Sequence, residues 1–203
     1  MSDRIYYMPG ATAVGVKCKD GVILAAEKRL SLGYYLLSKK ARKTFKVTDS
    51  IGMVCAGMVA DMQMLSKMVS IYANLYKLEK EKNISTKAAA KVISNLLFNL
   101  RLTPLLTETI IGGVDKDGPH IYILDPLGAL IEDKYAATGS GAPIAIGIIE
   151  SEYKDTLTVK ECEKLVEKAI RAALSRDIGS GDGIDMMIIT KDGIQEKFIP
   201  FTS

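Results

Sequence analysis

The order of the predicted elements constrains the fold most strongly, because strands and helices occur in blocks and do not alternate. Short apolar runs bounded by Asp-Gly and other turn residues predict strands. Apolar residues that recur every three or four positions predict a pair of helices in each half of the chain. Such blocks favour antiparallel sheets with helices on their outer faces and disfavour a doubly wound parallel sheet. The predicted strands are 13–18, 22–26, 34–37, 44–47, 51–56, 108–114, 120–125, 129–132, 135–138, 186–190 and 194–198, and the predicted helices are 58–82, 85–101, 144–151 and 158–175.

Composition places the chain among ordinary globular proteins. Of its 203 residues, 48% are hydrophobic and 25% are charged, which excludes intrinsic disorder and suffices for one domain with a substantial core. The net charge of +3 comes without a basic arm or an acidic tail, so nucleic acid is not an expected partner. Residues 1–20 lack the apolar block of a secretory signal, and no run approaches the roughly 18 apolar residues of a membrane span. We therefore expect a single cytoplasmic domain without membrane association.

Cysteine and histidine are too sparse for most familiar catalytic and metal sites. Cys18, Cys55 and Cys162 are scattered without a Cys-x-x-Cys pair, which argues against a structural zinc site and fits a reducing compartment. The only histidine, His120, follows Asp-Gly-Pro and precedes an apolar run, which is typical of a strand start after a turn. We therefore expect His120 to be structural.

Two glycine clusters are similar to phosphate-binding loops only in composition. Residues 179–183 follow a predicted helix and precede a strand, which is the reverse of the order that presents helix N–H groups to a phosphate. Residues 138–141 have the correct order but lack the downstream Lys-Ser/Thr pair of a nucleotide-binding loop. Composition and periodicity thus predict an antiparallel domain of strands and helices and do not indicate its function.

Short motifs along nearly the whole chain match the pattern of one family. The segment 10–16, Gly-Ala-Thr-Ala-Val-Gly-Val, and the segment 19–29, which begins Lys-Asp-Gly-Val-Ile-Leu-Ala, resemble the start of a proteasome β subunit. The segment 56–63, Ala-Gly-Met-Val-Ala-Asp-Met-Gln, is similar to that family's Ala-Gly-x-x-x-Asp-x-Gln. The resemblance, which is archaeal in style, also takes in residues 38–43, 111–113, 135–141 and 176–181.

This resemblance implies an α+β fold, the four-layer αββα sandwich of two antiparallel sheets flanked by helices that defines N-terminal nucleophile hydrolases. Residues 1–10 would form a propeptide-like leader, and residues 11–203 would form one proteasome β-type domain. In active members, cleavage after a glycine frees a threonine whose hydroxyl attacks a peptide carbonyl and whose α-amine acts as general base. An α-amine titrates near pH ~8, so this chemistry needs no histidine. The resemblance implies neither a cofactor nor a metal.

The resemblance also assigns roles to individual positions. Lys43 matches the lysine beside the nucleophile, Glu27 the acidic residue that pairs with it, and Arg29 a neighbouring basic position. Gly57 matches the residue whose N–H forms the oxyanion hole, where one donor is typically worth about 3 kcal/mol. The residues expected to orient the N-terminal amine are Ser140, Asp177 and Ser180, and those expected to line the first substrate pocket are Leu30, Ala41, Cys55 and Val59.

One departure from the family pattern concerns the nucleophile. Position 11, which follows the processing glycine Gly10, holds alanine where the family has threonine, and Ala13 replaces another threonine. Without a hydroxyl, Ala11 cannot form an acyl-enzyme, and loss of a nucleophile can cost about 10⁶ in turnover. Three explanations are open: a naturally inactive subunit, which we favour; an engineered Thr→Ala change; and cleavage after Ala11 that exposes Thr12. The last would move the hydroxyl to the opposite face of a strand.

The resulting hypothesis is a β-type subunit of the proteasome core particle that is itself inactive. Its partners would be α subunits and other β subunits in stacked heptameric rings, which enclose a chamber that degrades unfolded polypeptides. The alternative is an active threonine-type endopeptidase subunit, with a native threonine at position 11 or with Thr12 exposed by processing. A third hypothesis, a free-standing amidohydrolase acting on small amides, is disfavoured by the helix start at 56–63.

Overall fold

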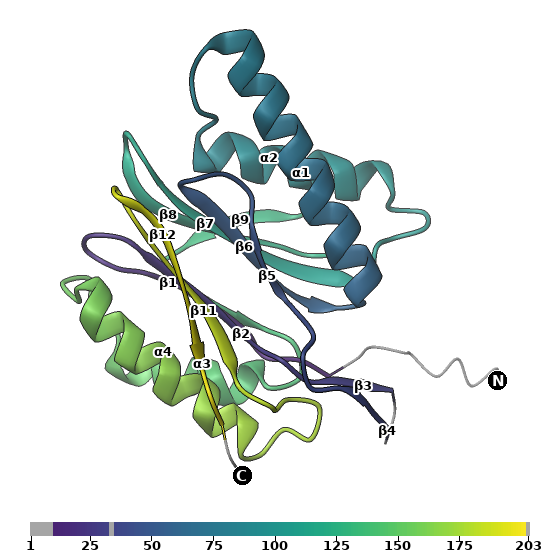
Figure 1. The fold of residues 1–203 in the computed structure, drawn as a ribbon, viewed down its shortest axis with the longest axis vertical. Coiled ribbons are helices and arrows are strands. Elements are labelled where there is room, and N and C mark those ends of the chain that lie inside the picture. Colours follow the sequence, from purple (N-terminus) through teal and green to yellow (C-terminus); the bar gives the residue numbers. More distant parts are fainter. Residues whose placement is uncertain (1–9, 33–34, 202–203) are drawn as a thin grey trace.

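The computed structural model describes residues 10–32 and 35–201, and these residues form two five-stranded sheets that lie face to face (Figure 1). Neighbouring strands in both sheets pair antiparallel. The first sheet contains, in spatial order, β10 (Tyr135–Thr138), β1 (Ala13–Lys17), β2 (Val22–Glu27), β11 (Ile184–Thr190) and β12 (Gly193–Ile199). The second contains β5 (Thr44–Lys46), β6 (Ile51–Gly57), β7 (Thr107–Asp115), β8 (Gly118–Leu124) and β9 (Leu130–Asp133).

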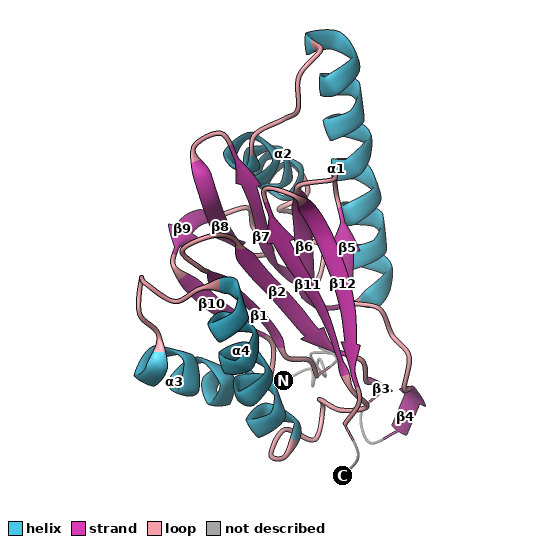
Figure 2. Cartoon of the chain, turned by 60° about the vertical axis from the view of Figure 1, so that its left-hand side comes forward, coloured by secondary structure: helices cyan, strands magenta, loops and turns pink. Residues whose placement is uncertain are grey.

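Within the described ranges, a pair of helices covers the outer face of each sheet (Figures 1 and 2). Helices α1 (Val59–Lys80) and α2 (Thr86–Asn99) pack on the second sheet, mainly against β6, β7 and β8. Helices α3 (Ala142–Glu152) and α4 (Val159–Leu174) pack on the first sheet, against β1, β2, β10 and β11. None of the helices in these ranges combines the length and the apolar character needed to cross a membrane.

The alternation of side chains along each strand divides the buried apolar residues into three layers. On β1, Val14 and Val16 pack toward α3 and α4, whereas Ala13 packs in the core between the two sheets. On β6, Met53 packs toward α1 and α2, whereas Val54 faces the core between the sheets. Because helices and the opposite sheet cover both faces, the inner strands β1, β2, β6, β7 and β11 are buried along most of their length, whereas the edge strands β9 and β12 are largely exposed. The predicted αββα sandwich is therefore confirmed.

The predicted elements are all present, with ends that differ by no more than two residues in the described ranges. Sequence analysis missed β3 (Leu30–Leu32), which pairs with β4 (Tyr35–Ser38) as a separate two-stranded ribbon. A three-residue strand is too short to show a period of two, so no pattern indicated it. Residue 34 of the predicted strand 34–37 and residues 1–9 of the predicted leader lie outside the described residues.

The first turns of two helices carry polar caps. The Ser85 hydroxyl accepts the N–H of Ala88 over 3.2 Å at the start of α2. At the start of α4, the Glu161 carboxylate accepts the N–H of Thr158 over 2.8 Å, which completes a capping box. These caps fix where α2 and α4 begin.

Thr138 on β10 carries a buried hydroxyl with no hydrogen-bond partner in the described part of the chain. Its neighbour across the strand pair is Ala13, which has no polar atom in its side chain. A buried unsatisfied hydroxyl costs about 1–3 kcal/mol. We therefore expect Thr138→Val, which keeps the shape of the side chain, to raise the melting temperature by about 2–12 °C in a thermal unfolding measurement.

Thr109→Val is the matched control for this substitution. Thr109 is a fully buried strand threonine whose hydroxyl lies 3.6 Å from the sulfur of Cys55 and therefore has a partner. We expect Thr109→Val to lower the melting temperature, because it leaves that sulfur without its contact. Equal losses in the two variants would contradict our interpretation of Thr138.

Candidate active site

Ala11, the predicted nucleophile position, lies just before β1 and is completely buried. Its backbone N–H donates to the hydroxyl of Ser140 over 3.1 Å, and its carbonyl accepts the N–H of Gly141 over 3.1 Å. Both residues belong to the turn between β10 and α3, which lies beside Ala11 because β10 pairs with β1. The nitrogen that cleavage would convert to an α-amine is thus held by a residue that was predicted to orient it.

Asp177, which follows α4, connects the two predicted serines. Its Oδ2 accepts hydrogen bonds from Ser140 Oγ over 2.7 Å and from Ser180 Oγ over 2.5 Å. Its Oδ1 accepts the N–H of Gly179 over 3.2 Å. The structure therefore brings Ser140, Asp177 and Ser180 together beside the backbone of Ala11, although they come from three segments of the chain.

Thr12 takes part in the same network from the other face of the chain. Its hydroxyl lies 2.7 Å from Ser180 Oγ, and because Ser180 donates its own proton to Asp177, the Thr12 hydroxyl is the donor in this contact. The Thr12 side chain is fully buried and lies on the side of the strand that carries Val14, beneath α3 and α4. Its hydroxyl is therefore enclosed and already engaged, as the argument from strand alternation anticipates.

Glu27 and Lys43 form a buried ion pair beside this network. Glu27 ends β2, Lys43 precedes β5, and their side chains are 0% and 1% exposed. The Lys43 ammonium donates to Glu27 Oε1 and, over 2.7 Å, to the carbonyl of Arg29. Glu27 Oε2 accepts the N–H groups of Arg29 over 2.6 Å and of Gly181 over 3.0 Å. Burial raises the pKa of Glu27, and the Lys43 charge and the backbone N–H groups oppose that shift.

Arg29 connects the end of β2 to the loop after α4. Its Nε donates to Asp182 Oδ2 over 2.9 Å, and its Nη1 donates to the carbonyl of Ile178 over 3.2 Å. The guanidinium lies directly against Gly181, where an added Cβ would come within 2.4 Å of it. The Arg29 side chain thus holds the loop that supplies Ser180 and the N–H of Gly181.

Gly57, the predicted oxyanion-hole residue, ends β6. The N–H of the next residue, Met58, donates to the carbonyl of Leu106 over 2.7 Å and fixes the chain where α1 begins. The end of β6 is close to the nucleophile position, because Gly139 lies against both the Ala11 carbonyl and the Ala56 side chain. The placement is compatible with the predicted role of Gly57, and the role itself stays a prediction.

Of the four predicted pocket residues, Leu30 lies on β3 and Cys55 on β6, Val59 begins α1, and Ala41 lies in the segment between β4 and β5. Ala41 and Cys55 are buried, whereas Leu30 and Val59 are partly exposed. Burial raises the pKa of the Cys55 thiol to about 12, so this side chain acts as an apolar surface at neutral pH. The three surface cavities that we describe are lined by other residues, and the pocket assignment stays a prediction.

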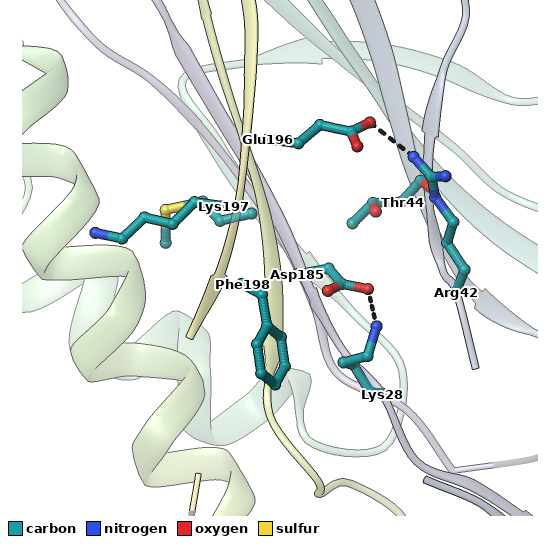
Figure 3. A pocket seen from close by; sticks show the side chains of 8 residues that line it. Lys28, Arg42, Thr44, Asp185, Glu196, Lys197 and Phe198 are labelled. Atoms are coloured by element: carbon teal, nitrogen blue, oxygen red, sulfur yellow. Dashed lines mark hydrogen bonds and ion pairs between the residues drawn. The ribbon is translucent and has the colours of Figure 1, made fainter. Parts of the chain in front are cut away.

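One of these cavities, of about 370 Å³, lies between β5, β11 and β12 (Figure 3). Two ion pairs line it: Lys28 with Asp185, and Arg42 with Glu196 over 2.7 Å. The charges in each pair offset one another, and the remaining cation of the lining, Lys197, pairs with Glu163, so every charged side chain in the described lining is already paired. No motif in the sequence indicated this cavity.

Sequence analysis also missed the close approaches at two glycines. An added Cβ at Gly141 would lie 1.9 Å from the Thr12 hydroxyl, and at Gly181 it would meet the Arg29 guanidinium. Both positions belong to glycine clusters that we considered as phosphate loops and as parts of the family motifs, but we predicted no contact for either glycine. A signal for these contacts was available in the sequence. Ser140 and Ser180, which we predicted to approach the N-terminal segment, stand next to Gly141 and Gly181, and a close approach between segments needs a small residue.

A comparison with protein families matches residues 8–189 to the proteasome subunit model. The chain belongs to the proteasome subunit family. The match covers most of the chain and includes every segment on which the resemblance rested. The sandwich that the structure shows is the fold that the resemblance to this family implied. The family that we identified from the motifs is therefore confirmed.

Curated relatives of similar length are archaeal β subunits of the proteasome. Proteasome subunit beta 2 of Pyrobaculum aerophilum is 46% identical over 188 residues, which cover 93% of each chain. Proteasome subunit beta 1 of Nitrosopumilus maritimus is 46% identical over 190 residues, which cover 94% of this chain and 96% of the relative. Proteasome subunit beta 2 of Caldivirga maquilingensis is 46% identical over 199 residues, with 98% and 99% coverage. Within the proteasome family, the chain is thus of the β type.

Proposed function

We propose that this chain is a non-catalytic β-type subunit of the proteasome core particle. The observation that carries the proposal is the alanine at position 11, which lies within an otherwise complete set of polar groups. Neither the backbone of Ala11 nor its methyl group can act as a nucleophile toward a peptide carbonyl. The site is assembled, and the atom that would form the acyl-enzyme bond is missing.

The surrounding residues have clear roles if a hydroxyl is placed at position 11. Ser140, held by Asp177, would orient the freed amine so that it accepts the hydroxyl proton. Lys43, charged and fixed by Glu27, would favour the deprotonated hydroxyl, and the N–H of Gly57 would stabilise the oxyanion. In this chain the same groups support the fold around Ala11 and carry out no proton transfer.

The two alternatives receive different support. Catalysis by Thr12 is disfavoured because its hydroxyl is buried, donates to Ser180 and lies on the face toward α3 and α4. A threonine at position 11 in the native chain remains compatible with the geometry of the site. A free-standing amidohydrolase is disfavoured by the similarity to proteasome β subunits over nearly the whole chain.

We further propose that the chain assembles with proteasome α subunits and with other β subunits in stacked heptameric rings. The particle would degrade unfolded polypeptides in its chamber, with catalysis carried out by another β chain. Residues 1–10 would remain attached as a leader before one domain at 11–203. The cytoplasmic location expected from the sequence stays a prediction.

Co-expression with α subunits and a second, active β chain from one organism tests the proposal. We expect this chain to enter a ring-sized particle with its full-length mass, measured by mass spectrometry of the assembled particle. Particles built with and without inactivation of the second β chain should differ in peptide hydrolysis, with no activity left after inactivation. A monomer or dimer in the presence of α subunits, or hydrolysis that survives inactivation, would overturn the proposal.

A further inference from the structure

Two buried cysteines lie where the β1–β2 turn packs against the start of α4. Cys18 follows β1 and is 3% exposed, and Cys162 lies in the first turn of α4 and is 0% exposed. Both belong to the apolar core beneath α3 and α4. Figure 1 shows α4 alongside the sheet that contains β1 and β2. Residues far apart in the sequence are thus neighbours in one core.

Two hydrogen bonds, between the residues that follow Cys18 and the residues that precede Cys162, fix the turn against the helix. The N–H of Lys19 donates to the carbonyl of Leu157 over 2.8 Å. The N–H of Val159, the first residue of α4, donates to Asp20 Oδ1 over 2.8 Å. Because these bonds involve residues next to Cys18 and just before Cys162, they hold the two backbone segments in register.

The two thiols lie near the same backbone carbonyl. The Cys162 thiol donates to the carbonyl of Leu157 over 4.0 Å, and this carbonyl also accepts the N–H of Lys19, the residue after Cys18. The neighbouring thiol raises the pKa of Cys18 and lowers that of Cys162. Cys162 is therefore the first of the pair to form a thiolate, which is the form that attacks disulfides. The third cysteine, Cys55, lies in the separate core beneath α1 and α2, with its sulfur beside Thr109.

We propose that Cys18 and Cys162 form a reversible disulfide that fastens the β1–β2 turn to α4. With a low-molecular-weight disulfide as oxidant, the Cys162 thiolate attacks one sulfur, forms a mixed disulfide and releases one thiol. The Cys18 thiolate then attacks the Cys162 sulfur, forms the internal bond and releases the second thiol. Two protein thiols are oxidised, and one small disulfide is reduced to two thiols.

The linkage would close a loop of more than a hundred residues, which is the case in which a cross-link constrains the unfolded chain most. We therefore expect the oxidised form to melt roughly 5–15 °C above the reduced form. Because both sulfurs are buried, oxidation of the folded chain needs local opening of the turn, whereas oxidation during refolding does not.

The test uses the full chain, either folded or refolding from denaturant, with oxidised glutathione as the probe. We expect a mass lower by two hydrogens, a non-reduced digest that joins the Cys18 and Cys162 peptides, and reversal of both changes by dithiothreitol. Cys55→Ala is the matched control and should retain the linkage, whereas Cys162→Ala should lose it together with the gain in melting temperature. The wild-type digest decides the question even if Cys162→Ala folds poorly.

The outcomes that overturn the proposal are distinct. Glutathione adducts without an internal link would show that the two sulfurs cannot approach bonding distance. Links to Cys55 would indicate pairing in a misfolded chain. Free thiols at both positions after oxidative refolding, or an internal bond that leaves the melting temperature unchanged, would equally contradict the proposed role.

Discussion

Replacing Ala11 with threonine is expected to start cleavage after Gly10 and peptide hydrolysis by this chain in the assembled particle. The substitution supplies the one group that the site lacks, while the Ala11 nitrogen is already held by Ser140. Because loss of a nucleophile can cost about 10⁶ in turnover, its restoration should raise hydrolysis by several orders of magnitude. The measurements are the intact mass of the chain and hydrolysis of a fluorogenic peptide, in particles whose other β chain has been inactivated.

Ala11→Val is the matched control, because valine has the shape of threonine without the hydroxyl. We expect the valine variant to assemble, to retain its leader and to be inactive. The double variant Ala11→Thr with Lys43→Met should lose most of the activity gained, since it removes the charge that favours the deprotonated hydroxyl. Equal masses and equal activity for the threonine and valine variants would contradict the assignment of the nucleophile position.

The layers of the fold could be predicted from the sequence, and the spatial order of the strands could not. Blocks of strands and helices sufficed for antiparallel sheets with outer helices, because both periods are local properties of the chain. The pairing of β2 with β11 joins residues from opposite ends of the chain, as in the register of Ala25 with Met186. Such pairing depends on which apolar faces meet in three dimensions, and no local pattern encodes it.

Some features of the candidate site could likewise be predicted from the sequence, and others could not. The motif match placed Glu27, Lys43 and Asp177 in one site, although each alone is an ordinary charged residue. The face on which Thr12 lies followed from the period of two along a strand. The contacts of Gly141 and Gly181 could not be predicted, because they arise where loops from distant segments meet.

Removing the carboxylate of Glu27 is expected to destabilise the chain more than removing the ammonium of Lys43. Glu27→Leu leaves a buried ammonium without its counter-charge and two N–H groups without an acceptor, at a cost of about 3–5 kcal/mol. The melting temperature should fall by about 6–20 °C. After Lys43→Met, Glu27 can take up a proton and keep its contacts with the N–H groups of Arg29 and Gly181, so the loss should be smaller.

The pH dependence of the Lys43→Met variant tests this explanation, because burial already raises the pKa of Glu27 and loss of Lys43 removes an opposing charge. A carboxyl whose folded pKa lies above its unfolded value of about 4.3 stabilises the fold below that value. Its contribution is lost as pH rises through the folded pKa. Relative to wild type, the melting temperature of Lys43→Met should therefore fall between mildly acidic and neutral pH.

Two further variants separate the effect of burial from that of charge. Glu196→Ala removes the carboxylate of the Arg42 pair, whose side chains are 54% and 51% exposed, and should cost no more than about 1 kcal/mol because water screens both charges. The double variant Glu27→Leu with Lys43→Met removes both buried charges and should recover part of the stability that Glu27→Leu loses. Equal losses for Glu27→Leu and Glu196→Ala, or no recovery in the double variant, would show that an unpaired buried charge is not what destabilises the chain.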